Sequence, residues 1–280
     1  MRSEGAKNIM ILMLIVINLT LSGFSLWNSK ENSLSQAHVD SIFSVLSKNN
    51  ISMYTELPRN FKPMKAMKLE PWRFSEEEIF DIFFEGESRI VMSSDDSTDF
   101  YTLGYTTLKF EKSENMFYYD APIVVDDIDA FCDGFTSRIN LKGSKLVLDN
   151  VSEGGKLVEY RVVYKEFIIY DSFIRLEFSE SGLVKIRLSM FTPTGFDGDA
   201  RSIYSADEAL FNLMFRLKSD SIDDETIKIV KMDVVYCLDE TGEEMAQTAT
   251  PYYRLYILYG NREIQNEPYL VNIYNNNIKR

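Results

Sequence analysis

The sequence predicts an α+β protein with a single N-terminal transmembrane helix, followed by two α+β units of helices packed on antiparallel sheets. Three observations favour this fold class. Residues 9–27 carry no charge, and the rest of the chain alternates between helical and strand-like spacing of apolar residues. Aromatic residues, which are enriched in strands, make up 13% of the chain. A chain of 280 residues can form one large domain or two modest ones.

The uncharged stretch reads IMILMLIVINLTLSGFSLW, close to the roughly 20 residues that a helix needs to cross a bilayer. Arg2 and Lys7 precede it, which predicts a cytoplasmic N-terminus over residues 1–8 and an extracytoplasmic position for the domain that follows. A cleaved secretory signal peptide is the alternative, because it also has a basic start and an apolar core. The length of the apolar run and Trp27 favour a retained single-pass anchor in the cell membrane.

The second half of this stretch is diluted by small and polar residues, namely Asn18, Thr20, Ser22 and Gly23. Such residues within a span often face another helix, where they hydrogen-bond or allow close approach. They are therefore the candidate helix–helix contact. Alternatively, they mark the weak end of a signal-peptide core.

The first predicted extracytoplasmic unit covers residues 28–121. Val39, Ile42 and Leu46 recur at helical spacing. A second, shorter helix is indicated by a capping box, in which Ser75 is followed three residues later by Glu78. The predicted strands of this unit are residues 51–57, 89–92, 100–110 and 116–119.

The second predicted unit covers residues 122–280 and repeats this pattern. Ile128, Phe131 and Phe135 mark one helical face, and Ser205 and Glu208 form another capping box. Strict alternation over residues 173–178 and 184–188 predicts a hairpin. The other predicted strands are residues 146–148, 157–164, 227–238, 252–259 and 269–274. The Tyr252–Tyr259 segment is the candidate for an exposed aromatic face.

Composition excludes several functions. The net charge of −13 disfavours nucleic-acid binding, because an acidic surface repels phosphates. Cys132 and Cys237 have no metal-type spacing, so they are expected to be buried thiols, although a bridge between them stays open. His38 is the chain's one histidine, which is too few for a histidine-based metal site.

No catalytic constellation is recognisable either. Acidic pairs such as Asp95 and Asp96 lie in predicted turns, where solvated charge is the ordinary explanation. Asp197 and Asp199 flank a glycine but do not fit the EF-hand spacing for calcium. The sequence therefore predicts no catalytic, cofactor-binding or metal-binding residues, and a protein that is not an enzyme.

A family resemblance rests on stretches spread along the chain. The first stretch, near the N-terminus, is KNIMILMLIVINLTL. The middle stretches are IYDSFIRLEFSESGLVKIRL and SADEALFNLMFRL. The last stretches are PYYRLYILYG and PYLVNIYNNNIK. In this order the stretches resemble the YycI/YycH family of two-component regulatory proteins. The last turn of that family usually has a glycine, which Asn275, Asn276 and Asn277 replace here. Asparagine tolerates the left-handed backbone of such a turn.

The resemblance implies a non-catalytic, membrane-anchored regulator with an extracytoplasmic domain. Its partners would be a sensor histidine kinase of the WalK type and a YycH-type partner regulator. It would modulate that kinase's control of cell-wall metabolism in Gram-positive bacteria, through contacts of its span and its outer domain. The alternative is an anchored cell-envelope enzyme or ligand-binding protein, which the acidic clusters of the outer domain would suit.

Overall fold

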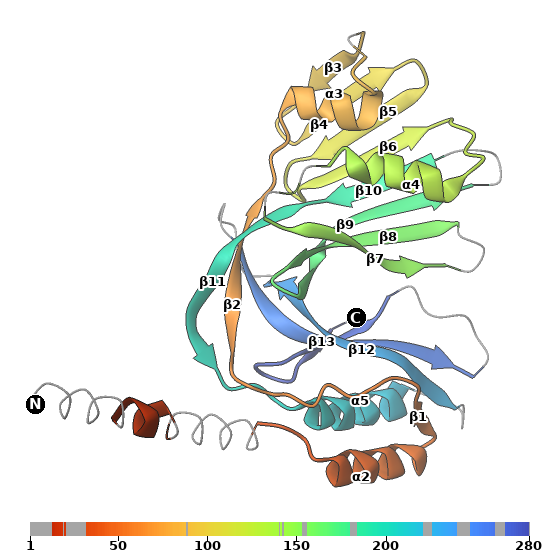
Figure 1. Cartoon of the computed structure of the whole chain (residues 1–280). Helices are drawn as coiled ribbons and strands as arrows, with labels where there is room; N and C mark the ends of the chain where they lie inside the picture. Colours follow the sequence, from red (N-terminus) through yellow and green to blue (C-terminus); the bar gives the residue numbers. More distant parts are fainter. Residues whose placement is uncertain are drawn as a thin grey trace, which may run out of the picture. The chain divides into compact units, whose positions relative to one another are not determined.

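The residues described by the computed structural model are 13–18, 20, 32–87, 89–139, 141, 143–152, 156–179, 184–220 (without the side chains of 218–220), 226–239, 247–260 and 267–279. They form two compact units. Unit 1 comprises Met1–Met64, Ala200–Asp233 and Tyr253–Arg280, and unit 2 comprises Lys65–Asp199 and Val234–Tyr252. Two long strands, β12 (Ile227–Leu238) and β13 (Gln247–Tyr259), contribute residues to both units (Figure 1).

The transmembrane helix predicted over residues 9–27 is contradicted. Among the described residues, no helix is long and apolar enough to cross a bilayer. Within the predicted span, the described residues are 13–18 and 20, which are helical and exposed.

The prediction of helices on separate antiparallel sheets is also wrong. The described strands belong to one 15-stranded sheet. Its pairings include two parallel ones, between β1 (Ile51–Met53) and β12 and between β12 and β9 (Phe167–Phe178). Alternation along the sequence identifies a strand and its buried face, but it does not specify which strands pair over long sequence distances.

The strands with residues in unit 2 follow the order β11-β2-β13-β12-β9-β10-β6-β5-β4-β3, with β8 beside β9 and β7 beside β8. Their remaining bounds are β2 (Met64–Pro71), β3 (Val91–Ser94), β4 (Thr98–Leu103), β5 (Thr106–Glu111), β6 (Met116–Ala121), β7 (Lys145–Val151), β8 (Leu157–Tyr164), β10 (Val184–Ser189) and β11 (Phe191–Arg201). The predicted hairpin is confirmed as β9 and β10, in which Leu176 lies opposite Ile186.

Helices α3 (Glu76–Phe84) and α4 (Ile128–Ser137) cover the same face of the unit 2 sheet (Figure 1). Phe83 of α3 contacts Phe117 of β6 and Phe135 of α4, with ring centroids 5.9 and 5.7 Å apart. The capping box at the start of α3 is confirmed, because the Ser75 and Glu78 side chains each accept a hydrogen bond from the other's backbone N–H. This aromatic layer is the core of unit 2.

Unit 1 contains α2 (Gln36–Ser47), α5 (Ala206–Asp220), β1, β14 (Tyr269–Asn272), β15 (Ile278–Lys279) and parts of β12 and β13. Helices α2 and α5 lie side by side (Figure 1), and His38 Nε2 is 3.0 Å from Asp207 Oδ2. The predicted apolar face of α2 is confirmed, since Val39, Ile42 and Leu46 are buried. In the last turn, Asn276 adopts a φ of 60°, the left-handed conformation.

The exposed aromatic face predicted over Tyr252–Tyr259 is wrong. Residues 252–257 are buried, and Tyr253 is 1% exposed. Its hydroxyl donates a hydrogen bond to the carbonyl of Tyr204 at 3.0 Å within unit 1. A strand that is hydrophobic on both sides is typical of a central position in a covered sheet, and β13 lies between β2 and β12.

Candidate functional site

Unit 2 contains a cavity of about 740 Å³, a volume typical of ligand-binding sites. Its walls come from the end of β2, from α3, from the β4–β5–β6 hairpins and from residues of β11, β12 and β13. The aromatic lining residues are Phe74, Tyr101, Phe110, Phe117 and Phe191. The charged ones are Arg73, Asp99, Lys112 and Glu114.

The floor of the cavity is a stack of rings. Phe110 and Phe117 lie directly opposite each other on β5 and β6, and their rings stack with centroids 4.2 Å apart. Phe74 meets the same Phe117 ring edge-on at 5.3 Å. Phe117 is fully buried while Phe110 and Phe74 are half-buried. The floor therefore offers partly exposed aromatic faces on a rigid base.

The rim carries fixed charges. Lys112 Nζ lies 2.8 Å from Asp99 Oδ1 and donates to the Asp95 carbonyl at 2.8 Å. Burial raises the pKa of Asp99, but hydrogen bonds from Lys112 and Ser94 outweigh it, so the pKa lies below its usual range. The Asp99 carboxylate is therefore charged at neutral pH, and the pair is held in place before any ligand arrives.

The turn between β5 and β6 shapes one side of the mouth. Asn115 is buried with a φ of 50°, which this residue type tolerates. Its Nδ2 donates a hydrogen bond to the carbonyl of Met190 at 2.8 Å. This bond ties the turn to the residue before β11, so Ser113 and Glu114 project from an anchored backbone.

The cavity thus combines apolar, partly exposed rings with a polar rim of both charge signs. Sites of this composition bind ligands with an apolar body and a charged or polar end, because the rings take up the body and the few polar groups set its orientation. Among the described residues, no group of three or more His, Cys, Asp or Glu side chains could hold a metal ion.

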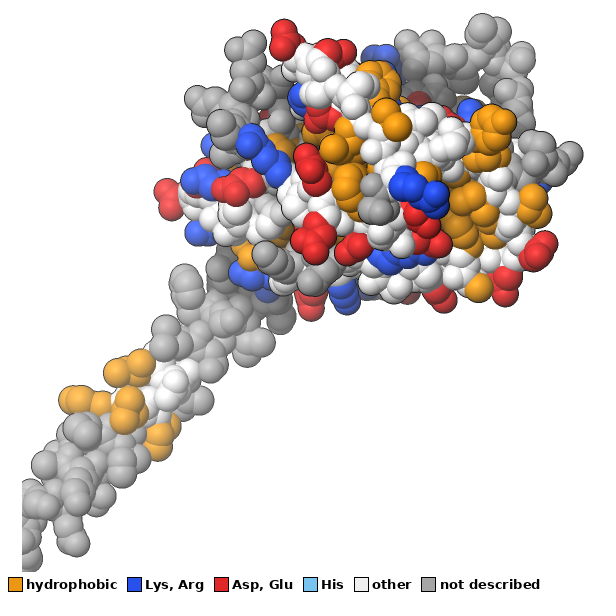
Figure 2. All heavy atoms as spheres, turned by 90° about the horizontal axis from the view of Figure 1, so that it is seen from above, with side chains coloured by type: hydrophobic (Ala, Val, Ile, Leu, Met, Phe, Trp, Pro, Cys, Tyr) orange, Lys and Arg blue, Asp and Glu red, His pale blue; other side chains and the backbone are white. Residues whose placement is uncertain are grey.

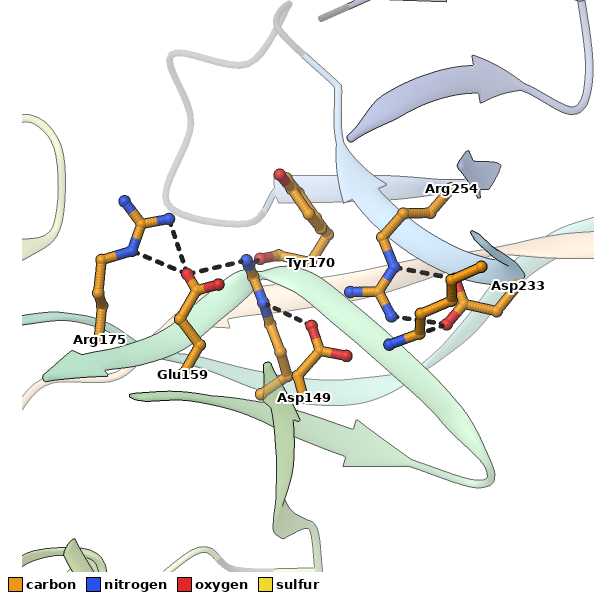
Figure 3. A network of polar contacts seen from close by, with 8 residues as sticks. Asp149, Glu159, Tyr170, Arg175, Asp233 and Arg254 are labelled. Atoms are coloured by element: carbon orange, nitrogen blue, oxygen red, sulfur yellow. Dashed lines mark hydrogen bonds and ion pairs between the residues drawn. The ribbon is translucent and has the colours of Figure 1, made fainter. Parts of the chain in front are cut away.

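A buried charge cluster lies elsewhere in unit 2 (Figure 3). Arg175 is bonded to the Glu159 carboxylate, with 2.7 Å between Nη2 and Oε1. Arg161 Nε lies 3.4 Å from Asp149 Oδ2, an ion pair without hydrogen-bond geometry. The Arg161 guanidinium also donates to the Tyr170 carbonyl and stacks on the Tyr170 ring at 4.2 Å. Glu159 and Asp149 side chains are each 1% exposed.

Two irregularities in strand register surround Arg161. The β7–β8 register shifts at Asp149, and the β8–β9 register shifts between Arg161 and Val162, opposite Tyr170. Arg161 satisfies groups at both sites. Two cations and two anions balance, and all but Arg175, which is 24% exposed, are buried. We therefore assign the cluster a structural role in fixing register rather than a role in binding.

Unit 1 has its own ion pair, in which the arginine is buried and the aspartate is 28% exposed (Figure 3). Arg254 is 0% exposed, and its guanidinium donates to both carboxylate oxygens of Asp233. The distances are 2.9 Å from Nε to Oδ1 and 2.6 Å from Nη2 to Oδ2. This fork geometry is the strongest form of a carboxylate contact. The Arg254 guanidinium also lies 5.4 Å from the centre of the Tyr256 ring, so it too is fully engaged.

None of the sequence-predicted site residues that the structure describes lines the cavity. Asn18 and Thr20 are exposed, and Thr20 Oγ1 donates to the Val16 and Ile17 carbonyls of its own helix. Ser22 and Gly23 are outside the described residues. Cys132 and Cys237 are both buried, as predicted, and they do not form a disulfide with each other. The exposed hydrophobic side chains include Val91, Tyr105, Val124, Leu148 and Val151. In the face seen in Figure 2, hydrophobic side chains reach the surface between charged ones.

Sequence reasoning did not find the cavity. A signal was present, because Lys112, Ser113, Glu114 and Asn115 form a polar turn. Phe110 lies shortly before this turn and Phe117 shortly after it. A polar turn of this kind is also typical of an ordinary solvated loop. Only the approach of Phe74, Asp99 and Phe191 from other strands and segments distinguishes a binding site from a solvated loop.

Comparisons with known proteins give little more. No protein-family profile and no curated protein matches this chain. A solved structure of an uncharacterized protein from Eubacterium rectale ATCC 33656 is similar with a TM-score of 0.49 and 10% sequence identity. The similarity covers 82% of this chain and 90% of that one.

Proposed function

We propose that this chain is a non-catalytic regulatory protein that uses the aromatic cavity of unit 2 to bind a partner. The observation that carries the proposal is the cavity of about 740 Å³ with half-buried Phe74 and Phe110 and a fixed rim charge pair. Pre-organised rings and charges reduce the ordering cost of binding.

The chemistry of the lining favours a short protein segment. Such a segment presents an aliphatic or aromatic side chain to the Phe110 and Phe74 rings and a charged or polar group to the rim. The rim offers Arg73 and Lys112 to an anion and Asp99 and Glu114 to a cation. A peptide carries both kinds of group along a backbone that also hydrogen-bonds.

The partner that the family resemblance supports is a sensor histidine kinase of the WalK type, acting with a YycH-type partner regulator. Regulation then follows from differential affinity. A regulator that binds one kinase conformation more tightly shifts the equilibrium toward it, by no more than that difference in binding free energy. In this proposal the folded units make the contact.

Site-specific photo-crosslinking tests this contact. A photo-reactive amino acid replaces Ser113, an exposed residue of the cavity lining. Its matched control replaces Tyr105, which is 92% exposed in another turn of unit 2. The proposal expects a covalent adduct with the kinase from position 113 and none from position 105. Equal yields from both positions, or no adduct from position 113, would contradict it.

A further inference from the structure

Strand β7 is an edge strand of unit 2. Its described residues pair with β8, and no described strand pairs with its other side. An edge strand exposes a row of backbone N–H and C=O groups, which another extended chain can pair with. Edge pairing is a recurrent way to bind a peptide, in which backbone bonds give affinity and pockets for alternate side chains give specificity.

A register shift aligns the apolar residues of this edge. Leu148 lies opposite Tyr160 and Val151 lies opposite Val158, with the shift between Leu148 and Asn150. Residues three apart in a regular strand point to opposite faces, since side chains alternate. The inserted residue, Asp149, turns toward Arg161 and leaves Leu148 and Val151 on one face.

An open groove of about 430 Å³ lies along that face. Leu148 and Val151 form one wall and are 56% and 49% exposed. Val158, Tyr160 and Ile128 complete the apolar surface. Exposed apolar residues grouped beside an unpaired strand edge are typical of an interaction site.

The rim of the groove is acidic. Asp126, Asp127 and Asp129 line it, and no Lys or Arg does so among the described lining residues. One of these carboxylates, Asp129, contributes to the raised pKa values of two neighbouring side chains, Cys132 and Tyr160. Burial, followed by Asp129 and Asp133, raises the pKa of the Cys132 thiol to about 11. Burial and then Cys132, Asp133 and Asp129 raise the pKa of Tyr160 to about 12.

We infer that the β7 edge and this groove bind an extended segment of a partner protein that presents apolar side chains and Lys or Arg side chains on the same face of the strand. The segment adds as a strand beside β7. Its apolar side chains enter the groove against Leu148 and Val151, and its basic side chains meet the Asp126 and Asp129 carboxylates. This surface is separate from the aromatic cavity, so the inference does not depend on the proposed function.

The test uses a synthetic heptapeptide with serine at every second position and with valine and lysine taking turns at the positions between, so that valine and lysine share one face of the strand. A peptide with glutamate in place of each lysine is its charge-reversed counterpart. Binding to the full chain is measured by fluorescence anisotropy. Leu148→Lys places a repelling charge at the edge and should abolish binding of the lysine peptide. Its matched control is Val91→Lys, a 70% exposed residue on edge strand β3, which should leave binding unchanged.

A second pair of variants tests how much the acidic rim contributes to binding. Asp126→Asn with Asp129→Asn should weaken binding about fivefold, the sum of two exposed ion pairs. Glu76→Gln with Glu77→Gln changes matched acids in the first turn of α3 and should have no effect. Hydrogen exchange of the β7 amides should slow when the lysine peptide is bound.

Three results would overturn the inference. One is equal binding of the lysine and glutamate peptides. Another is equal loss of binding in Leu148→Lys and Val91→Lys. The third is concentration-dependent self-association that Leu148→Lys abolishes, because it would make a second copy of the chain the occupant of the edge.

Discussion

Lys112 and Asp99 form an ion pair at the rim of the unit 2 cavity, with 2.8 Å between Nζ and Oδ1. The pair joins the β5–β6 turn to β4, two elements that form the cavity together with the Phe110 and Phe117 rings. It stabilises the fold and also fixes the charges that a ligand meets.

The Asp99 carboxylate predicts a pH dependence. Its folded pKa lies below the ordinary value of 3.8, so the unfolded chain binds its proton more readily. The stabilisation is therefore present above that ordinary value and is lost as the pH falls through the folded pKa. Asp99→Asn should lower the free energy of unfolding near neutral pH and lose its effect in strong acid. Urea unfolding at both pH values checks this, with Asp96→Asn as the exposed control.

The buried cluster predicts a large loss of stability from a single change. Arg161→Met leaves the Asp149 carboxylate without its cation and removes a contact to Glu159. Breaking a buried ion pair from one side costs about 3–5 kcal/mol. Arg187→Met removes a more exposed pair with Glu177 and should cost less than about 1 kcal/mol. Similar losses in denaturant titrations of the two variants would contradict a structural role for the cluster.

The aromatic floor predicts a second stability contrast. Phe117 is 2% exposed and contacts rings from β5, α3 and the segment after β2. Phe117→Ala should destabilise the protein by about 3–5 kcal/mol through a cavity in the core. Phe100→Ala, on β4 and 42% exposed, should cost much less. Thermal unfolding of both variants measures the difference.

The two cysteines predict a chemical result. Cys132 and Cys237 are buried and do not form a disulfide, and the pKa of Cys132 is raised to about 11, mainly by burial. The thiolate is the reactive form, so a disulfide reagent should label neither cysteine in the native protein at neutral pH. Both should react once denaturant unfolds the chain. Rapid labelling without denaturant would show that Cys132 or Cys237 is open to solvent.

Local features were predictable from the sequence because they depend on neighbouring residues. The capping box at Ser75 and Glu78, the apolar face of α2 and the β9–β10 hairpin are examples. The pairing of β12 with β1 and β9 was not predictable, since it joins residues more than fifty positions apart. The burial of Tyr253 was not predicted either, because it depends on the position of β13 between the distant strands β2 and β12.

The candidate sites were also not predictable, because they depend on contacts between residues far apart in the sequence. The charged residues Glu159, Arg161 and Arg175 lie in strands where alternation predicts a polar face, and nothing in the sequence says that other strands bury them. The cavity needs Phe74, Phe110 and Phe191 to meet in space. The predicted transmembrane helix failed differently, since it was inferred from hydropathy over residues 9–27 alone.

Kinase autophosphorylation is the direct test of regulation of a partner through the unit 2 cavity. A WalK-type kinase in nanodiscs is titrated with the wild-type chain, with Ser113→Trp, which places a large ring at the cavity mouth, and with Tyr105→Trp, which places the same ring on an open turn. We predict that the wild type and Tyr105→Trp change the rate of autophosphorylation equally and that Ser113→Trp loses most of the effect. Equal effects of all three proteins, or no effect of the wild type, would contradict it.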